Sequence, residues 1–179
     1  MKYIKRKKVT FLISGGGSNL YQILSKNLTS KKFKTISIIS DNKVSKQIKE
    51  LIKSNELEIN IFEKVFKLKP KFFGDCDIVF SVGYLKKINS EIIKNYEIIN
   101  LHPSLLPKYK GLMTHKRMLI NKEVKYGYSI HKVTRYLDDG EILSQNQKNI
   151  STSNENELSL NHKKLEHQYV FKDLVRFSN

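Results

Sequence analysis

The sequence predicts an α/β fold built on one open, mostly parallel sheet with helices on both faces. Over the first hundred residues, short β-branched apolar runs alternate with segments of helical spacing, which is typical of parallel strands joined by helices. A glycine-rich turn at 14–17 (SGGG) follows the first run, where open parallel sheets commonly bind ligands. Later in the chain, two strand-like runs follow each other with only a short connection between them. We therefore expect a Rossmann-like sheet with antiparallel strands added in its C-terminal part.

The elements can be placed in chain order from their apolar spacing. Leu20, Ile23 and Leu24 recur on one face of a helix that opens at Ser18 or Asn19. A polar segment at 151–156 (STSNEN) is typical of a loop that ends in a helix N-cap. Strands are expected at 8–13, 35–40, 57–62, 77–82, 98–101, 127–133 and 142–150, and further helices at 45–54 and from about 155 to 177.

Length and composition indicate one ordinary globular domain over 1–179. The chain has 179 residues, of which 39% are hydrophobic and 28% charged, enough for one sizeable core. Cys76 is the one cysteine, so an internal disulfide is excluded and a cytoplasmic location is expected. The apolar run at 9–13 is too short for a signal peptide, and we expect no membrane helix.

The formal net charge of +16 leaves two interpretations open. Clustered Lys and Arg would suit a non-catalytic RNA-binding module. Here the lysines are spread over all segments, together with abundant Asn and Ile, and no aromatic-basic motif accompanies them. We therefore expect a solvated basic surface without a nucleic-acid partner, which would still attract small anionic substrates.

The glycine turn and the residues after it, Gly17, Ser18 and Asn19, can bind an anion through backbone N–H groups at a helix N-terminus. The Walker pattern is absent, and Leu20 stands where the dinucleotide motif needs a third glycine. Asp41, after the second strand, leaves a nicotinamide site open. A plain tight strand-to-helix turn without a ligand is a further alternative. A single small phosphate fits the motif best.

Asn100 and His102 stand two residues apart at a strand end, so their side chains can point the same way. An amide donor and an imidazolium aimed at one point stabilise negative charge on a carbonyl oxygen. Such a histidine needs a carboxylate nearby to raise its pKa, and Asp138 or Asp139 can supply it. From these residues alone, a purely structural role remains open.

The stretch IINLHPSLLPKYKG at 98–111 resembles the signature of the folate-dependent formyltransferases, and SGGGSNL at 14–20 resembles the branch that acts on glycinamide ribonucleotide. The resemblance runs from Lys8 to Glu166. It implies transfer of a formyl group from 10-formyltetrahydrofolate to the primary amine of glycinamide ribonucleotide in de novo purine synthesis. A formyltransferase acting on another amine, such as an amino sugar nucleotide, is the alternative.

The resemblance also implies roles for individual residues and a cis bond at Leu106–Pro107. No metal is expected, because the five histidines show no HExxH or i, i+4 pairing and Cys76 stands alone. Monomer and homodimer both stay open. The chain departs from the family pattern in two further places. Acidic residues flank Gly140, and Lys163 stands where a neutral polar residue is common in the family. The implied residues are Asn100, His102 and Asp138 for catalysis, Gly17, Ser18 and Asn19 for the substrate phosphate, Glu166 for the ribose hydroxyls, Leu85, Lys86 and Ile88 beside the folate, and Ser129 and His131 in support.

Overall fold

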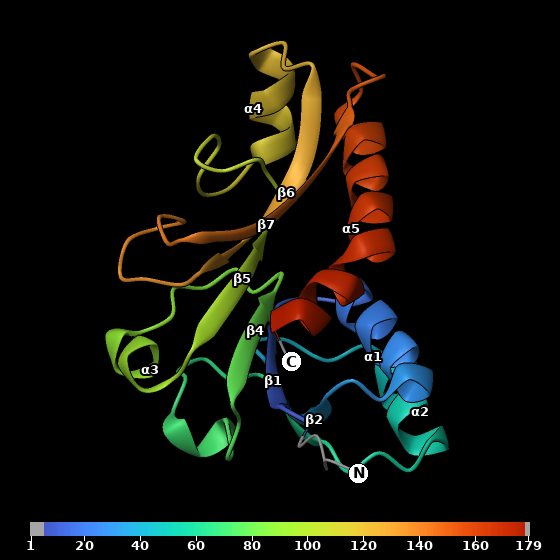
Figure 1. The fold of residues 1–179 in the computed structure, drawn as a ribbon, viewed down its shortest axis with the longest axis vertical. Helices are drawn as coiled ribbons and strands as arrows, with labels where there is room; N and C mark the ends of the chain where they lie inside the picture. The colour runs from blue at the N-terminus through green and yellow to red at the C-terminus, as the bar shows by residue number, and fades with distance from the viewer. Residues whose placement is uncertain (1–5, 178–179) are drawn as a thin grey trace.

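The computed structural model describes residues 6–177 and shows a seven-stranded sheet in the order β3-β2-β1-β4-β5-β6-β7 (Figure 1). The first five of these strands in the sheet run parallel, and β6 and β7 are each antiparallel to their neighbour. The strands are β1 (Lys8–Ile13), β2 (Lys34–Ser40), β3 (Asn60–Phe62), β4 (Ile78–Val82), β5 (Ile98–His102), β6 (Lys125–Lys132) and β7 (Ile142–Asn149). The helices are α1 (Ser18–Ser30), α2 (Lys46–Ser54), α3 (Ser90–Asn95), α4 (Thr114–Ile120) and α5 (Glu155–Phe177), with a 3-10 turn η1 (Pro70–Phe72).

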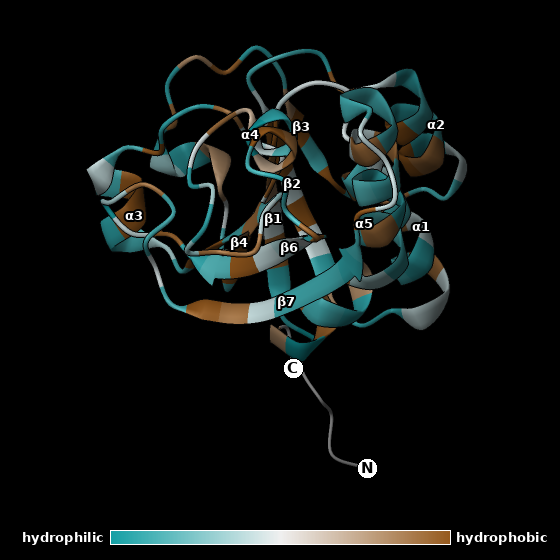
Figure 2. Cartoon of the chain, turned by 90° about the horizontal axis from the view of Figure 1, so that it is seen from above, coloured by the Kyte–Doolittle hydropathy of each residue, from teal (hydrophilic) through white to brown (hydrophobic). Residues whose placement is uncertain are grey.

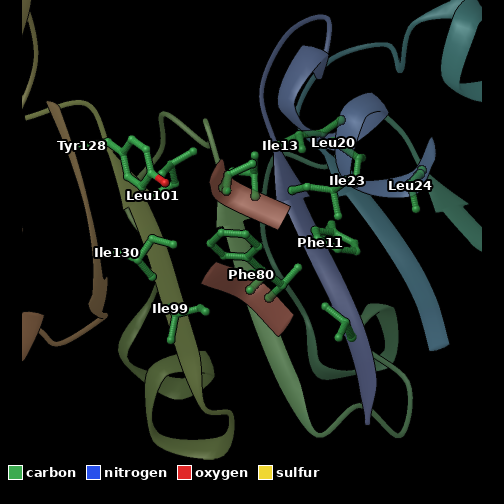
Figure 3. Packing of buried hydrophobic residues seen from close by; sticks show 14 of the residues in the cluster. Phe11, Ile13, Leu20, Ile23, Leu24, Phe80, Ile99, Leu101, Tyr128 and Ile130 are labelled. Carbon is green, nitrogen blue, oxygen red and sulfur yellow. The ribbon is translucent and has the colours of Figure 1, made fainter. Parts of the chain in front are cut away.

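Two apolar clusters fill the two faces of the sheet. The larger cluster joins β1, β4, β5 and β6 to α1, α2 and α5, which lie together on one side (Figure 1). Phe11 and Phe80 lie at its centre, with Ile99 and Ile130 beside them and Leu20 and Ile23 reaching in from α1 (Figure 3). The smaller cluster lies on the side of α3 and η1. The edge strand β7 is mostly polar (Figure 2), because its side chains are largely outside both clusters.

The predicted fold class is confirmed, and most predicted elements fall within two residues of their observed bounds. The N-cap expected within 151–156 is Asn154, whose Oδ1 accepts a hydrogen bond of 3.0 Å from the Glu157 amide. The strand predicted at 57–62 is wrong in length, because pairing with β2 begins only at Asn60. The helix α4, for which the apolar spacing gave no signal, lies between β5 and β6.

The sheet order places the glycine turn beside the loop that follows β4. The chain leaves β1 toward β2 on one side and leaves β4 toward β5 on the other, which is the arrangement in which open α/β sheets form a ligand crevice at the carboxyl ends of the strands. The Ser14 amide donates to the Gly83 carbonyl at 3.0 Å, and the Leu85 amide donates to Ser14 Oγ at 3.0 Å. These bonds fix the two loops against each other at the rim of the sheet.

Of the helices in residues 6–177, none combines the length and apolarity that crossing a membrane requires.

Candidate active site

The carboxyl end of β5 brings Asn100 and His102 to the rim of the sheet, between β4 and β6. Asn100 pairs with Ser81 on one side and His131 on the other, and His102 pairs with Ser129. His102 is buried, whereas Asn100 is partly exposed. The amide and imidazole therefore lie at one edge of the sheet, as their spacing predicted.

The segment after His102 is fastened to β6 and β7 by buried hydrogen bonds. Ser129 Oγ donates to the Ser104 carbonyl at 2.7 Å and accepts from the Leu106 amide at 2.9 Å. Gln145 Nε2 donates to the Leu106 carbonyl at 2.9 Å. The Leu106–Pro107 bond is cis, as predicted. The supporting position expected for Ser129 is thus observed, and it fixes the loop that carries Tyr109 and Gly111 back toward His102.

Asp138 lies against His102, which decides between the two adjacent aspartates. His102 Nδ1 is 3.4 Å from Asp138 Oδ2, and the same oxygen accepts a 2.8 Å hydrogen bond from the Gly111 amide. The Asp138 side chain is 10% exposed, whereas Asp139 lies at the surface and pairs with Lys110. Burial raises the pKa of Asp138, but His131, the Gly111 amide and His102 together bring it below its usual value, so Asp138 is ionised at neutral pH.

The expectation that a carboxylate raises the pKa of His102 above its ordinary value is wrong for the protein without substrate. Burial lowers the pKa of His102, and the Tyr109 carbonyl and Asp138 offset this only in part. The surroundings nonetheless suit a cation, since Nε2 is 2.9 Å from the Tyr109 carbonyl while Nδ1 faces Asp138. A neutral ring can donate to only one of these two acceptors.

His131 contributes more to this site than the sequence indicated. Its Nε2 is 3.2 Å from Asn100 Nδ2 and 3.5 Å from Asp138 Oδ1, and its Nδ1 is 2.9 Å from the Lys132 carbonyl. If Nδ1 carries the proton and donates to that carbonyl, Nε2 accepts one N–H of the Asn100 amide. The second N–H of Asn100 is then held in a fixed direction, available to a ligand.

The glycine turn presents the start of α1 without a side-chain cap. Gly17 occupies the N-cap position with φ of 66°, and the helix's first backbone bond runs from the Tyr21 amide to the Gly17 carbonyl at 2.9 Å. The amides of Ser18 and Asn19 precede that bond and are the donors that helix geometry leaves without partners. A Cβ on Gly17 would lie 2.8 Å from Ile48 Cδ1, whereas Gly16 has open space around it.

The side chain of Asn19, and not only its backbone, takes part in the site. Its Nδ2 donates to Glu166 Oε2 at 2.8 Å and so joins the glycine turn to α5. Burial raises the pKa of Glu166 to about 7, against the opposing effects of Asn19 and Lys163. The two regions predicted to hold phosphate and ribose are therefore in direct contact.

The three residues expected beside the folate have different environments. Leu85 is 69% exposed in the loop that follows β4. Ile88 is only 7% exposed and packs in the smaller core cluster, and its place beside the folate stays a prediction. Lys86 Nζ lies 3.5 Å from Asp41 Oδ2 and 4.9 Å from the centroid of the exposed Phe66 ring.

His115 and His162 belong to the neighbourhood of Glu166 and were missed. His115 lies on α4 and His162 on α5, where it shares a helix face with Glu166 four residues later. The i, i+4 spacing of His162 and Glu166 is visible in the sequence. Their contact with α4 is visible only in the fold.

Comparison with known proteins agrees with this geometry. The model of the family described as formyl transferase matches residues 7–174. The phosphoribosylglycinamide formyltransferase of Escherichia coli K12 is 30% identical over 149 residues, covering 76% of this chain and 70% of the relative. A chloroplastic phosphoribosylglycinamide formyltransferase from Vigna unguiculata is 32% identical over 160 residues, covering 79% of this chain but only 51% of the relative.

The fold has close counterparts among solved structures. The phosphoribosylglycinamide formyltransferase of Coxiella burnetii, solved in complex with CHES, superimposes with a TM-score of 0.81 at 26% identity. The match covers 97% of this chain and 88% of that one. With the family model spanning nearly the whole chain and the Asn100, His102 and Asp138 side chains gathered at one rim of the sheet, this protein belongs to the formyl transferase family.

Proposed function

We propose that the protein transfers a formyl group from 10-formyltetrahydrofolate to the primary amine of glycinamide ribonucleotide, a step of de novo purine synthesis. The observation that carries the proposal is the joining of the uncapped α1 terminus to Glu166 through Asn19. It supports a phosphorylated ribose as the ligand, because a helix N-terminus favours an anion and the adjacent carboxyl can accept hydrogen bonds from hydroxyls.

The phosphate binds to the backbone N–H groups of Gly17, Ser18 and Asn19. The positive end of the helix dipole and the unpartnered amides both favour an anion there. The ribose hydroxyls donate to Glu166, whose carboxyl is held by Asn19. Lys163, one turn before Glu166, adds a positive charge on the same helix.

Leu85 and Lys86 fit the folate co-substrate in part. The exposed Leu85 offers an apolar surface to a flat ring system, and Gly83 beside it has no side chain to obstruct the crevice. The buried Ile88 supports this loop from below. The co-substrate supplies a formyl carbonyl, whose carbon accepts the amine.

Asn100 and His102 stabilise the negative charge that develops on the formyl oxygen as the amine attacks. The Asn100 side chain, whose Nδ2 lies 3.2 Å from His131 Nε2, is held in a fixed position and donates an N–H to that oxygen. The 3.4 Å contact between His102 Nδ1 and Asp138 is long enough to be exchanged for the substrate oxygen, while Nε2 stays with the Tyr109 carbonyl. Negative charge forming there favours the protonated ring.

Asp138 receives the proton that the attacking amine loses, through a bridging water. Its lowered pKa keeps it ionised at neutral pH and therefore able to accept. The proton then returns to the nitrogen that releases the formyl group. We propose the cytoplasm as the location of this reaction, since the chain has a single cysteine.

Formyl transfer to a panel of amines tests the proposal. With 10-formyltetrahydrofolate as donor, glycinamide ribonucleotide should be formylated with a kcat/KM at least about a hundredfold above its dephosphorylated form or an amino sugar nucleotide, because only the first presents phosphate and ribose together. Preference for the amino sugar nucleotide would establish the alternative acceptor. Tight, sequence-tolerant RNA binding at about 0.15 M salt without transfer would favour the non-catalytic alternative.

A further inference from the structure

A second chain of polar side chains leads away from the site through the interior. His115 Nε2 lies 2.9 Å from His162 Nδ1, and His162 Nε2 lies 3.8 Å from Glu166 Oε1. Glu166 Oε2 accepts the hydrogen bond from Asn19. The chain thus connects α4, α5 and the glycine turn, with α4 and the first turns of α5 flanking the start of β6 (Figure 1).

Burial along this chain is greatest at its middle member, His162. His115 is half-buried, His162 is 1% exposed and the Glu166 side chain is 11% exposed. His162 packs against the ring of Tyr126 with centroids 5.6 Å apart. His162 Nε2 has no hydrogen-bond partner within residues 6–177, so the atom that faces the Glu166 carboxyl is free to exchange a proton with it.

The two histidines can meet each other in only two neutral arrangements, because one ring must donate and the other accept. In the first, His162 donates from Nδ1, so its Nε2 is a bare acceptor facing Glu166. In the second, His162 accepts at Nδ1 from His115 Nε2–H, so its own Nε2 carries the hydrogen. The first arrangement suits a protonated Glu166, and the second suits a carboxylate.

We propose that His162 and His115 form a proton relay that carries the Glu166 proton toward α4 and the solvent when the ribose-binding carboxyl ionises. The Glu166 O–H bond breaks and a His162 Nε2–H bond forms, after a side-chain rotation that shortens the 3.8 Å separation to about 3 Å. The His162 Nδ1–H bond breaks and a His115 Nε2–H bond forms. The His115 Nδ1 hydrogen leaves to water, and both rings end neutral with exchanged tautomers.

The protonation equilibria of the members keep both rings neutral over the range in which Glu166 ionises, as the exchange of tautomers requires. The pKa of Glu166 is about 7, so its carboxyl changes state near neutral pH. Burial, together with His115 and His102, lowers the pKa of His162 to about 3, and burial lowers that of His115 against the attraction of Glu155. The remaining groups that act on Glu166 are Asn19 on α1 and Lys163 on its own helix, and Tyr128 of β6 lies within electrostatic range.

The role of the relay in substrate binding rests on the proposed function. Ribose hydroxyls donate hydrogen bonds and so favour the carboxylate form of Glu166. A substrate seated on Glu166 also covers the part of that side chain through which a proton would otherwise leave. The route through His162 begins at Oε1, whereas Oε2 accepts the hydrogen bond from Asn19, and it runs within the contact between α4 and α5.

Nuclear magnetic resonance titration of the free protein tests the relay without any substrate. The Glu166 carboxyl carbon should titrate with a midpoint near pH 7, and the side-chain nitrogen shifts of His162 and His115 should report a tautomer exchange with the same midpoint. The relay is overturned if both rings keep one tautomer across the Glu166 titration, or if either ring becomes charged in that range.

The variant His162→Gln breaks the chain while keeping a polar side chain. In it, the tautomer of His115 should no longer follow Glu166. In the matched control His167→Gln, which alters the next histidine of α5, the exchange should persist with its midpoint moved by less than about half a unit. If the coupling survives His162→Gln, the proton travels another way and the relay is wrong.

A separate measurement addresses the proposed function. Calorimetry of glycinamide ribonucleotide binding at pH 6.5, in buffers of different ionisation enthalpy, should show release of more than about half a proton. Tautomer exchange in the free protein with no binding of this substrate would uphold the relay and refute the proposed acceptor. Binding without proton release would refute the link between the relay and the ribose.

Discussion

At the scale of the residue, Asp138 and Asp139 show how neighbours with the same side chain acquire different roles. Asp138 is turned inward by a backbone φ of 46° and contacts His102, His131 and the Gly111 amide. Asp139 points to the surface and pairs with Lys110. Burial and partners, rather than residue type, make one carboxylate part of the site.

Asp138→Asn should lower kcat by about 10²–10⁴-fold, because it removes the charge beside His102 and the proposed acceptor of the amine proton. Asn tolerates the left-handed backbone at this position, so the fold should survive. The same change should lower the pKa of His102 further, since Asp138 is one of the groups that raise it. Steady-state kinetics and a titration of the His102 ring measure the two effects.

Asp139→Asn is the control for that variant, because an exposed ion pair contributes little. Its kcat should stay within about fivefold of the parent. A larger loss for Asp139→Asn than for Asp138→Asn would reverse the assignment of the two aspartates.

At the scale of the element, the turn between β1 and α1 contains one glycine that the fold requires and one that it does not. Gly17 has a positive φ and lies against Ile48 and Ile13 of the core. Gly16 carries neither constraint. Substitution of Gly17 therefore cannot report on phosphate binding alone.

Gly17→Ala should lower the free energy of unfolding by about 1–2 kcal/mol through the left-handed backbone conformation alone. The overlap of the new Cβ with Ile48 should lower it further. This corresponds to a fall in Tm of roughly 4 °C. Gly16→Ala should leave Tm within about 1 °C but raise KM for the phosphorylated amine, because its Cβ blocks close approach of the anion. Equal KM effects on amine and folate in Gly16→Ala would contradict the phosphate assignment.

The loop after β5 depends on the Ser129 hydroxyl. Ser129→Ala leaves the buried Leu106 amide and Ser104 carbonyl without this partner and should cost about 1–3 kcal/mol, measured by urea denaturation. Because the same loop carries Tyr109 to His102, kcat should fall as well. Ser54→Ala, an exposed helix hydroxyl, should change the stability by less than about 0.5 kcal/mol. A Ser129→Ala protein of parental stability would show that the loop is held by its other bonds.

At the scale of the whole molecule, two buried groups give the stability opposite dependences on pH. The pKa of Glu166 rises from 4.5 to about 7 on folding, so its contribution to stability is present at low pH and is lost as the pH rises toward 7. The pKa of His162 falls from 6.5 to about 3, so the stability falls as the pH drops through that range. Between pH 4.5 and 6.5 the two slopes oppose each other.

In the Glu166→Gln variant, the dependence of stability on pH that His162 produces should no longer be offset by Glu166. Relative to the parent, its free energy of unfolding should increase with pH by up to about 1.4 kcal/mol per unit between pH 4.5 and 6.5. His162→Gln should show the opposite slope relative to the parent. Urea denaturation at half-unit pH steps measures both, and parallel curves for all three proteins would refute the opposed titrations.

The local pattern determined most of the fold and the shared strand face of Asn100 and His102. Apolar periodicity fixes which faces of strands and helices are buried, so the alternation of elements up to residue 102 implies the parallel sheet, and the i, i+2 spacing implies that Asn100 and His102 share a face. The tertiary structure decided what depends on partners distant in the chain: which aspartate meets His102, the net pKa of that ring and the burial of Ile88. It also decided the contact of His115 with His162, which are 47 residues apart. Desolvation and side-chain contact depend on every element packed around a group, and local spacing carries no information about them.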